Sequence, residues 1–436
     1  MKIIREQDSN YQDEINCLFN RKAFSDEVLH TVSNILNDIK HNRNSAISHY
    51  AGQFDNVQLS PTQFRLTQNE IDNAVNSVPQ KTKNFINGAI ENIKTFAKQQ
   101  IPHNWNFTPR HGVTLGERFT PLKRIGAYIP GGTAPLVSTA VHTIAIAAVA
   151  GVKEIVALTP PGKNNILIPE LIYAMHQSGA TEIYRIGGVY GIGAIAYGTE
   201  TIKKVEKIVG PGNAYVSAAK KYVYGDVAID MVAGPSEIMI IADKNSNPHF
   251  VAADILSQAE HGSGHEQSVL ITDSEKFVEL VLENIEKQKK KLSRNEMVER
   301  VYQNGLFFII VDNLEKAIAI ADEYAPEHLE IVCQNADKFA NKVNAAGAIF
   351  IGEYTPEPVG DFVAGPSHVL PTGGSAKYFN GLSVNTFFRR SSTVKYTKQA
   401  LEREIPMIEK FAELEGLDAH CNSALIRFND LIRAND

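Results

Sequence analysis

Apolar residues in the first hundred positions recur three and four apart, which is the spacing of amphipathic helices. Residues 1–50 are therefore predicted to be largely helical, and a second helical stretch is expected at 69–99, interrupted at Pro79 because proline breaks a helix. Residues 101–125 are richer in proline and glycine, so they predict a crossing segment with short strands and a boundary near Lys123. The helical predictions depend on Val28, Val32, Ile35, Leu36, Ile39, Ile71, Ala74, Val75, Val78, Phe85, Ile86, Ala89, Ile90, Ile93 and Phe96.

From residue 125 onward, short β-branched runs alternate with helical runs, and glycine or proline stands at most of the joins. This alternation predicts parallel strands with right-handed crossovers and ligands at the carboxyl ends of the strands. A second such series begins at Met231, so we expect an α/β fold with two duplicated, Rossmann-like domains and a cleft between them. The predicted strands are 125–129, 154–158, 183–186, 207–209, 237–242, 268–272, 306–311, 329–332 and 348–351, and the helices include 138–150 and 168–178.

The last stretch, 376–436, changes character again. Its pattern predicts a hairpin-like part at 382–388 and then two helices broken at Gly416. We expect an arm or helical tail here, not an independent core.

The segment 254–261 predicts a helix, because its apolar residues are mostly good helix formers and the run Gly262-Ser263-Gly264 ends it. Asp254, Gln258 and His261 are spaced i, i+4 and i+7, so their side chains share one face. Gln258 and His261 would offer a pair of metal ligands beside a loop that leaves room for a substrate. The ordinary alternative is an amphipathic helix whose terminal histidine suits the helix dipole, and the segment alone favours that alternative.

Composition bounds the class of protein. A chain of 436 residues exceeds what one hydrophobic core usually organises, and 43% apolar with 21% charged residues is typical of a globular protein. The net charge of −6 argues against nucleic-acid binding, since the basic run 287–291 most simply solvates a helix. Three scattered cysteines fit a reducing compartment, and no signal sequence or membrane span is recognisable, so a cytoplasmic location is expected.

Glycine-rich turns were compared with the dinucleotide-binding fingerprint. Residues 191–196 match Gly-x-Gly-x-x-Ala, but the preceding Gly187-Gly188 already makes the turn, and no acidic residue ends the strand 207–209. An incidental glycine-rich helix start is therefore favoured. The turns at 128–132 and 210–213 are better candidates, because glycines after a strand let backbone N–H groups approach a ligand.

Acid–base and metal-binding groups occur in three other places. Glu327-His328 sets a carboxylate beside an imidazole at the start of a strand. Residues 360–368 place an acid and a histidine in a glycine- and proline-rich loop, and Glu415 and His420 flank the break between the last two helices. Each group alone has an ordinary role as a turn or cap. Together with Gln258 and His261, however, Asp361 and His420 would complete four nitrogen and oxygen ligands for zinc.

Seven segments, in order over nearly the whole chain, resemble the histidinol dehydrogenase family. They are Tyr128-Ile-Pro-Gly-Gly, Gly210-Pro-Gly-Asn-Ala, Ala233-Gly-Pro-Ser-Glu, Ser257-Gln-Ala-Glu-His, Ala325-Pro-Glu-His-Leu, Val363-Ala-Gly-Pro-Ser-His-Val-Leu-Pro-Thr and Glu415-Gly-Leu-Asp-Ala-His.

The resemblance implies an NAD-dependent enzyme with one Zn²⁺ per subunit that oxidises L-histidinol to L-histidine through the aldehyde. It also implies that the two Rossmann-like domains are incomplete and that small terminal domains lie beside them. A further implication is an intertwined homodimer in which His420 serves the neighbouring subunit. On this basis we expect an N-terminal segment at 1–26 and 107–127, domain A at 27–106 and 236–380, domain B at 128–235 and a tail domain at 381–436.

The resemblance also implies roles for single residues. His328 would act as the base for the hydroxyl proton, and Glu327 would activate a water for the second oxidation. No cysteine is required. Tyr190 stands where the family usually has a glutamine that contacts the cofactor, a departure that bears on the strength and geometry of NAD binding. The implied zinc ligands are Gln258, His261, Asp361 and His420; the substrate-binding residues are these four with Ser236, His328, His368 and Glu415; the cofactor-binding residues are Tyr128, Tyr190 and Asn213.

Two alternatives stay open. A related zinc and NAD dehydrogenase of another small amino or sulfonated alcohol would keep the zinc and the Glu327–His328 pair, but should lose the pocket for an imidazole and amine; Glu415 and His420 speak against it. A catalytically inactive metal-binding homologue should lack some acid, base or ligand, and here all are present.

Overall fold

The computed structural model describes residues 1–21, 24–131, 136–261 and 264–428. The chain divides into two compact units. Unit 1 comprises Met1–Gln100 and Leu122–Phe387, and unit 2 comprises Ile101–Pro121 and Phe388–Asp436. The four-part division into domains stays a prediction.

Unit 1 contains two parallel sheets. Their strand orders are β1-β11-β10-β9-β12-β13 and β6-β5-β4-β7-β8. In each sheet the strand that comes first in its strand–helix series, β9 or β4, lies centrally. The next two strands of the series lie on one side of it and the last two on the other. β1, from a region whose pattern predicts helices, pairs at the edge of the six-stranded sheet. The strands predicted between 125 and 351 are confirmed, and with them the α/β class. Their bounds are β1 (Lys2–Arg5), β4 (Arg124–Tyr128), β5 (Glu154–Leu158), β6 (Glu182–Tyr184), β7 (Lys207–Val209), β8 (Ala228–Ile229), β9 (Glu237–Ala242), β10 (Gln267–Thr272), β11 (Leu306–Ile310), β12 (His328–Ile331) and β13 (Ala348–Ile351).

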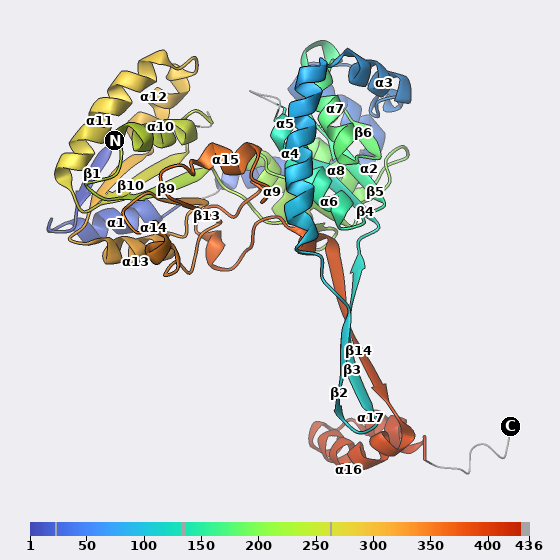
Figure 1. Ribbon diagram of the computed structural model, residues 1–436. Helices are drawn as coiled ribbons and strands as arrows, with labels where there is room; N and C mark the ends of the chain where they lie inside the picture. Colours follow the sequence, from blue (N-terminus) through green and yellow to red (C-terminus); the bar gives the residue numbers. More distant parts are fainter. Residues whose placement is uncertain (22–23, 132–135, 262–263, 429–436) are drawn as a thin grey trace. The chain divides into compact units, whose positions relative to one another are not determined.

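Helices cover both faces of the six-stranded sheet (Figure 1). Because apolar side chains pack on both sides, all six residues of β9 are buried, which is typical of a central parallel strand. One face carries α10 (Pro248–Ala259), α11 (Glu275–Gln288) and α12 (Asn295–Asn304), and the other carries α1 (Tyr11–Phe19), α13 (Leu314–Tyr324) and α14 (Ala336–Ala340).

The five-stranded sheet shares a core with α2 (Asp26–Asp55), α8 (Gly188–Tyr197) and α9 (Ala214–Val223). The predicted break at Pro79 is confirmed, since α3 (Gln68–Ser77) ends before it and α4 (Gln80–Lys98) begins after it. The predicted helix at 138–150 contains a π-helical turn. Its parts are α5 (Val137–Ala140), the turn η2 (Val141–Ala145) and α6 (Ile146–Val149), and α7 (Pro169–Ser178) follows β5.

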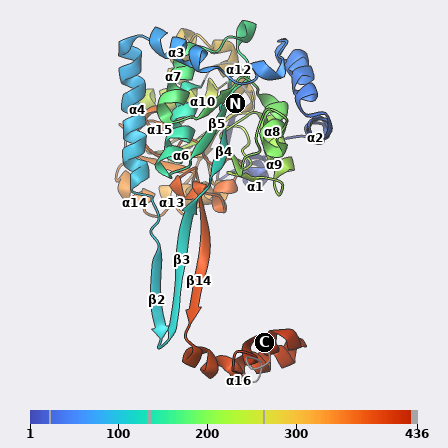
Figure 2. The same ribbon diagram turned by 90° about the vertical axis from the view of Figure 1, so that its right-hand side faces the viewer.

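Unit 2 is an antiparallel three-stranded ribbon followed by two helices (Figure 2). The strands β2 (Trp105–Arg110), β3 (Val113–Pro121) and β14 (Phe388–Tyr396) lie in the order β14-β3-β2, and the helices are α16 (Lys398–Glu415) and α17 (Asp418–Leu425). The hairpin predicted at 382–388 is wrong: this segment holds the 3₁₀ turn η6 (Val384–Phe387), and β14 pairs with the distant β3. The break at Gly416 is confirmed, with a left-handed φ of 67° that suits glycine.

None of the described helices combines the length and the hydropathy that a transmembrane segment requires.

We predict that Gly347→Ala lowers the melting temperature. A Cβ at Gly347 would lie 2.5 Å from the carbonyl oxygen of Glu327, so β13 would have to move away from β12. Such overpacking typically costs about 1–3 kcal/mol. Thermal unfolding of the purified variant measures the effect.

Gly88→Ala in α4 is the matched control, because a Cβ there meets nothing within 4 Å. Replacing a helical glycine should stabilise the protein by roughly 0.5–1 kcal/mol. An unchanged melting temperature for Gly347→Ala would contradict the close packing of β12 and β13.

Candidate functional site

Predicted site residues gather at the amino edge of the six-stranded sheet. His328 is the first residue of β12, Glu327 directly precedes it, and Ser236 directly precedes β9. Because β9 and β10 are parallel, α10 must run back between them, which returns Gln258 to the edge where these strands begin. The catalytic pair thus lies at the edge opposite to the one where the alternation of strands and helices predicts ligands.

The helix predicted at 254–261 ends earlier than expected. α10 ends at Ala259, so Asp254 and Gln258 lie on the helix while His261 lies two residues beyond it. Gly262 and Ser263, which were expected to end the helix, lie outside the described residues.

Glu327 and His328 are both bound to the main chain of Glu237. The N–H of Glu237 donates to Oε2 of Glu327 at 3.0 Å, and the Nδ1–H of His328 donates to the carbonyl oxygen of Glu237 at 3.0 Å. This second bond fixes the proton of a neutral His328 on Nδ1, so Nε2 is left as an acceptor. Nε2 has no hydrogen-bond partner among the described residues and is buried.

Burial sets the protonation of the acids around this pair. It raises the pKa of Glu327 well above the ordinary value, and the nearby carboxylate of Glu237 raises it further. Burial likewise raises the pKa of Asp361 to about 6, helped by the carboxylate of Glu357. Oδ1 of Asp361 lies 3.9 Å from Nε2 of His328. Strongly shifted acids beside an unpaired imidazole are typical of a catalytic site.

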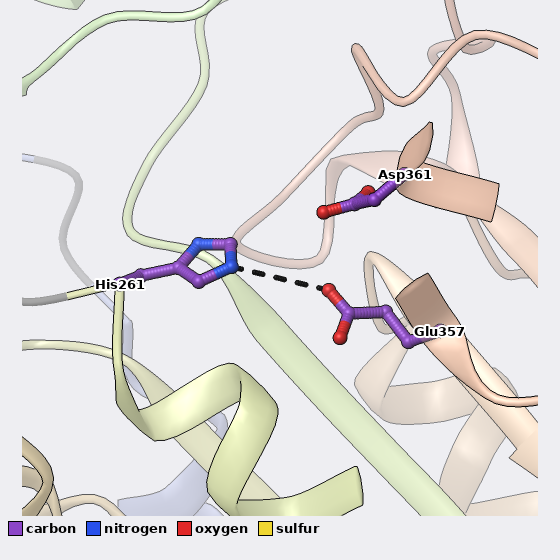
Figure 3. A group of neighbouring side chains, drawn as sticks. All are labelled: His261, Glu357 and Asp361. Carbon is purple, nitrogen blue, oxygen red and sulfur yellow. Dashed lines mark ion pairs between the residues drawn. The ribbon is translucent and has the colours of Figure 1, made fainter. Parts of the chain in front are cut away.

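His261, Glu357 and Asp361 form a cluster that could hold a metal ion (Figure 3). One ligand atom from each lies within 4.8 Å of the others, and Nε2 of His261 is 4.0 Å from Oε1 of Glu357. Glu357 and Asp361 lie on α15 (Glu357–Phe362), one helical turn apart. The structure therefore brings the predicted ligands His261 and Asp361 together and adds Glu357, which was not predicted.

Unpaired buried atoms fit a cation at this place. Gln258 is fully buried, and neither its amide oxygen nor its amide nitrogen has a hydrogen-bond partner among the described residues. Oε1 of Glu357 is also unpaired, while its Oε2 accepts a bond of 2.7 Å from the Ser257 hydroxyl. An unpaired buried polar group costs about 1–3 kcal/mol, and coordination of zinc would offset that cost.

A second pair of carboxyl groups, Asp254 and Glu330, lies next to the cluster. Burial raises the pKa of Asp254 to about 6 and that of Glu330 well above its ordinary value. Oε1 of Glu330 accepts the backbone N–H of Glu357 at 2.6 Å. Glu330 thus anchors the first residue of α15, and the raised pKa values favour binding of a proton by this pair of carboxyl groups.

His368 is held in one orientation beside Asp361. Its Nδ1–H donates to the carbonyl oxygen of Asp361 at 3.0 Å, and its Nε2 lies 3.1 Å from the hydroxyl of Thr139. The ring stacks on His142 with centroids 4.4 Å apart. Burial lowers the pKa of His368 to about 4, so the ring is neutral at physiological pH.

The predicted cofactor residues lie around the five-stranded sheet. Tyr128 ends β4, and its buried hydroxyl accepts the N–H of Gly188 at 3.3 Å. Tyr190 is only 1% exposed, and its hydroxyl donates to the carboxylate of Asp55. Asn213 is exposed and caps α9 by accepting from the N–H of Val216. Each of these side chains therefore has a structural role, and their contact with a cofactor stays a prediction.

The turn after β7 is rigidly held. Nζ of Lys220 donates to the carbonyl oxygen of Gly210 at 2.8 Å, and the N–H of Gly210 donates to Oδ2 of Asp230 at 2.8 Å. Lys220 and Asp230 are themselves paired and buried. At Gly210, φ is +112° and a Cβ would lie 2.2 Å from the carbonyl oxygen of Tyr128, so only glycine fits.

Glu415 and His420 belong to unit 2. Glu415 ends α16 and His420 lies on α17. Both line a mostly apolar groove of 530 Å³ within that unit. Unit 1 by itself thus holds three of the four predicted zinc ligands.

Sequence reasoning missed several residues of the site. Glu357 precedes Asp361 by four positions, a spacing that places both on one helix face, and this signal was available. Glu330 is an acid in a buried strand, two residues after His328, which is a second signal. Arg21 forms an ion pair with Glu237. The two residues are far apart in the sequence, so no local pattern indicates this contact.

The comparisons with known proteins agree over nearly the whole chain. The family model described as histidinol dehydrogenase matches residues 19–428. The histidinol dehydrogenase of Clostridium acetobutylicum is 42% identical over 92% of this chain and 93% of that protein, and that of Bacillus subtilis is 42% identical with the same coverage. The crystal structure of histidinol dehydrogenase from Elizabethkingia anophelis superposes with a TM-score of 0.92 at 36% identity, covering 99% of this chain and 98% of that one.

We predict that the metal-free protein binds Zn²⁺ and that His261→Ala weakens this binding. Loss of a group that only supports a ligand typically weakens metal binding roughly 10- to 100-fold, and loss of the ligand itself should weaken it more. Removing the imidazole leaves two carboxylates that cannot complete the site. Titration calorimetry with metal analysis measures the affinity and the stoichiometry.

His249→Ala is the matched control. His249 lies near the start of α10, the helix that precedes His261, and is hydrogen-bonded to Asn284 and Gln288, away from the cluster. Equal zinc affinity in the two variants would show that His261 is not a ligand.

Proposed function

The chain belongs to the histidinol dehydrogenase family and is an enzyme of histidine biosynthesis, and we propose that it oxidises L-histidinol to L-histidine in two steps that each reduce one NAD. One Zn²⁺ per subunit would be held by Gln258, His261 and Asp361, with His420 from a second subunit. Bound zinc would supply a Lewis acid that fixes the substrate and favours loss of its hydroxyl proton.

The observation that supports this proposal best is the tautomer of His328. Because Nδ1–H is committed to the carbonyl of Glu237, Nε2 is an unpaired base at the edge of the metal cluster. In the first step, Nε2 takes the hydroxyl proton of histidinol while the carbinol carbon gives its hydride to NAD. The products are the aldehyde, NADH and a protonated His328.

Glu327 suits the second step. Its Oε2 is held by the N–H of Glu237, and because burial raises its pKa, its deprotonated carboxylate would be a stronger base toward water than an exposed one. His328 would first release its proton to solvent. Glu327 would take one proton from the water as the hydroxide adds to the aldehyde carbon, and the hydrate anion would then lose a hydride to a second NAD and a proton to His328, which gives the carboxylate.

A thiol intermediate would be the alternative route for an aldehyde. Cys333 follows the far end of β12, and burial raises its pKa to about 11, so it is a poor nucleophile. Cys17 lies on α1 and Cys421 on α17 in unit 2, neither within the cluster. The positions of the cysteines therefore favour attack by water.

We assign NAD binding to the five-stranded sheet, with Tyr128, Tyr190 and Asn213 as its contacts. The rigid glycine turn after β7 supports this assignment, because its backbone can approach a ligand closely. The shared strand order of the two sheets supports a duplicated, Rossmann-like architecture, in which nucleotides bind where the order reverses.

Substrate recognition is assigned to the groups around the metal cluster. Ser236 and His368 in unit 1, and Glu415 with His420 from unit 2, would bind the polar groups of histidinol. The Nδ1–H of His368 is taken by the carbonyl oxygen of Asp361, so the neutral ring can only accept a hydrogen bond at Nε2, and it does not repel a cationic substrate. We expect the enzyme to work in the cytoplasm.

The exposed apolar side chains of unit 2 support a homodimer. The ribbon and helices of this unit expose large apolar side chains that a monomer would leave in water, while few of its residues are buried. A second subunit would cover these side chains and receive Glu415 and His420. The exposed residues are Trp105 (48%), Phe107 (51%), Val394 (68%), Met407 (60%), Phe411 (58%) and Leu414 (70%).

We predict that the zinc-loaded enzyme forms about two NADH per L-histidinol consumed, as two hydride transfers require. Absorbance at the NADH band with limiting substrate measures the ratio. One NADH per substrate with release of the aldehyde would contradict the proposal.

We also predict that His328→Asn slows both half-reactions, since the same Nε2 takes a proton in each. Glu327→Gln should chiefly slow oxidation of the aldehyde, by roughly 10²–10⁴-fold as expected for loss of a general base. Steady-state rates with the alcohol and with the aldehyde separate the two steps. Equal losses in both steps for Glu327→Gln would contradict this division of roles.

A further inference from the structure

We propose that Arg21 and Glu237 are a positioning pair that holds Glu327 and His328 in their catalytic arrangement. This inference rests on the proposed function. Neither residue is expected to touch the substrate; both act through the two residues that do.

The main chain of Glu237 is the common support of the catalytic pair. Its N–H holds the Glu327 carboxylate and its carbonyl oxygen holds the His328 ring, each at 3.0 Å. A movement of this one residue would therefore displace the acid and the base together. A displacement of about 1 Å in such groups can reduce the rate roughly 100-fold.

The side chain of Glu237 is fixed on both of its oxygens. Nη1 of Arg21 donates to Oε2 at 2.6 Å, and the N–H of Gly373 donates to Oε1 at 3.1 Å. Glu237 is 2% exposed. The carboxylate therefore cannot turn, and Glu237 enters β9 in one orientation.

Arg21 also reaches the chain on the other side of the pair. Its guanidinium lies 3.6 Å from the centre of the Tyr324 ring and donates to the Tyr324 carbonyl oxygen. Tyr324 is the last residue of α13, three positions before Glu327. One arginine thus connects the start of β9 with the segment that leads into β12.

A contribution to stability does not explain this pair. The side chains of Arg21 and Glu237 are 9% and 3% exposed, and the desolvation cost of such a buried ion pair commonly equals or exceeds its attraction. What sets this pair apart from other buried ion pairs is its contacts: the main chain of Glu237 holds Glu327 and His328, and Arg21 binds the chain at Tyr324.

Arg21→Met tests the proposal in the zinc-loaded, full-length enzyme. We expect kcat to fall by roughly 10- to 100-fold with both the alcohol and the aldehyde. KM for L-histidinol should stay within about twofold, because the contacts with the substrate are kept. Loss of both steps distinguishes this variant from Glu327→Gln, which affects chiefly the second.

Arg124→Met is the matched control for a merely structural role. Arg124 forms a comparably buried pair with Glu182 at the start of the five-stranded sheet, at 2.9 Å, with side chains 7% and 14% exposed. Arg124→Met should lower the melting temperature and leave kcat unchanged. Parallel losses of kcat in Arg124→Met and Arg21→Met would overturn the proposal.

Conservative variants decide the matter if the methionine variants fail to fold. Arg21→Lys keeps the charge but cannot contact both Glu237 and the carbonyl oxygen of Tyr324, so kcat should fall about threefold or more. Arg124→Lys should keep the wild-type kcat. Equal kcat in Arg21→Lys and the wild type would overturn the proposal. If the wild type itself does not oxidise L-histidinol, the proposed function fails instead.

Discussion

Buried polar atoms without partners are the constraint on which the site depends. Folding normally pairs such atoms, and each unpaired one costs about 1–3 kcal/mol. Near one edge of the six-stranded sheet, the amide of Gln258, Oε1 of Glu357 and Nε2 of His328 are all buried and unpaired within the described residues. A bound cation and substrate would satisfy them, so the energetic cost in the free protein is recovered on binding.

The topology explains why these groups meet. A helix that joins two parallel strands must run back along the sheet, so the end of α10 returns to the edge where β9 and β12 begin. Glu237, at the start of β9, then lies beside His328, at the start of β12, and one residue can hold both members of the catalytic pair by its main chain. The acid, the base and the metal cluster share one edge because each is tied to a strand or helix end there.

Local patterns predicted what depends on neighbours in the sequence. The β-branched runs gave the parallel strands, and Pro79 and Gly416 marked helix ends because their effects are local. The spacing of Gln258 and His261, and the resemblance to a family, pointed to the metal cluster. Contacts between distant segments could not be predicted in this way: β14 pairs with β3 where a hairpin was expected, β1 joins a sheet built from residues beyond 236, and Arg21 meets Glu237 only after folding.

The central claim is that Gln258, His261 and Asp361 of one chain, with His420 of a second, surround a single zinc ion. Anomalous diffraction at the zinc absorption edge from crystals of the zinc-loaded protein tests it most directly. The account predicts one strong peak per chain, bonded to all four residues at roughly 2.0–2.2 Å, with Glu357 beside it. A peak elsewhere, or a zinc ion from which the Gln258 amide is turned away, would contradict it.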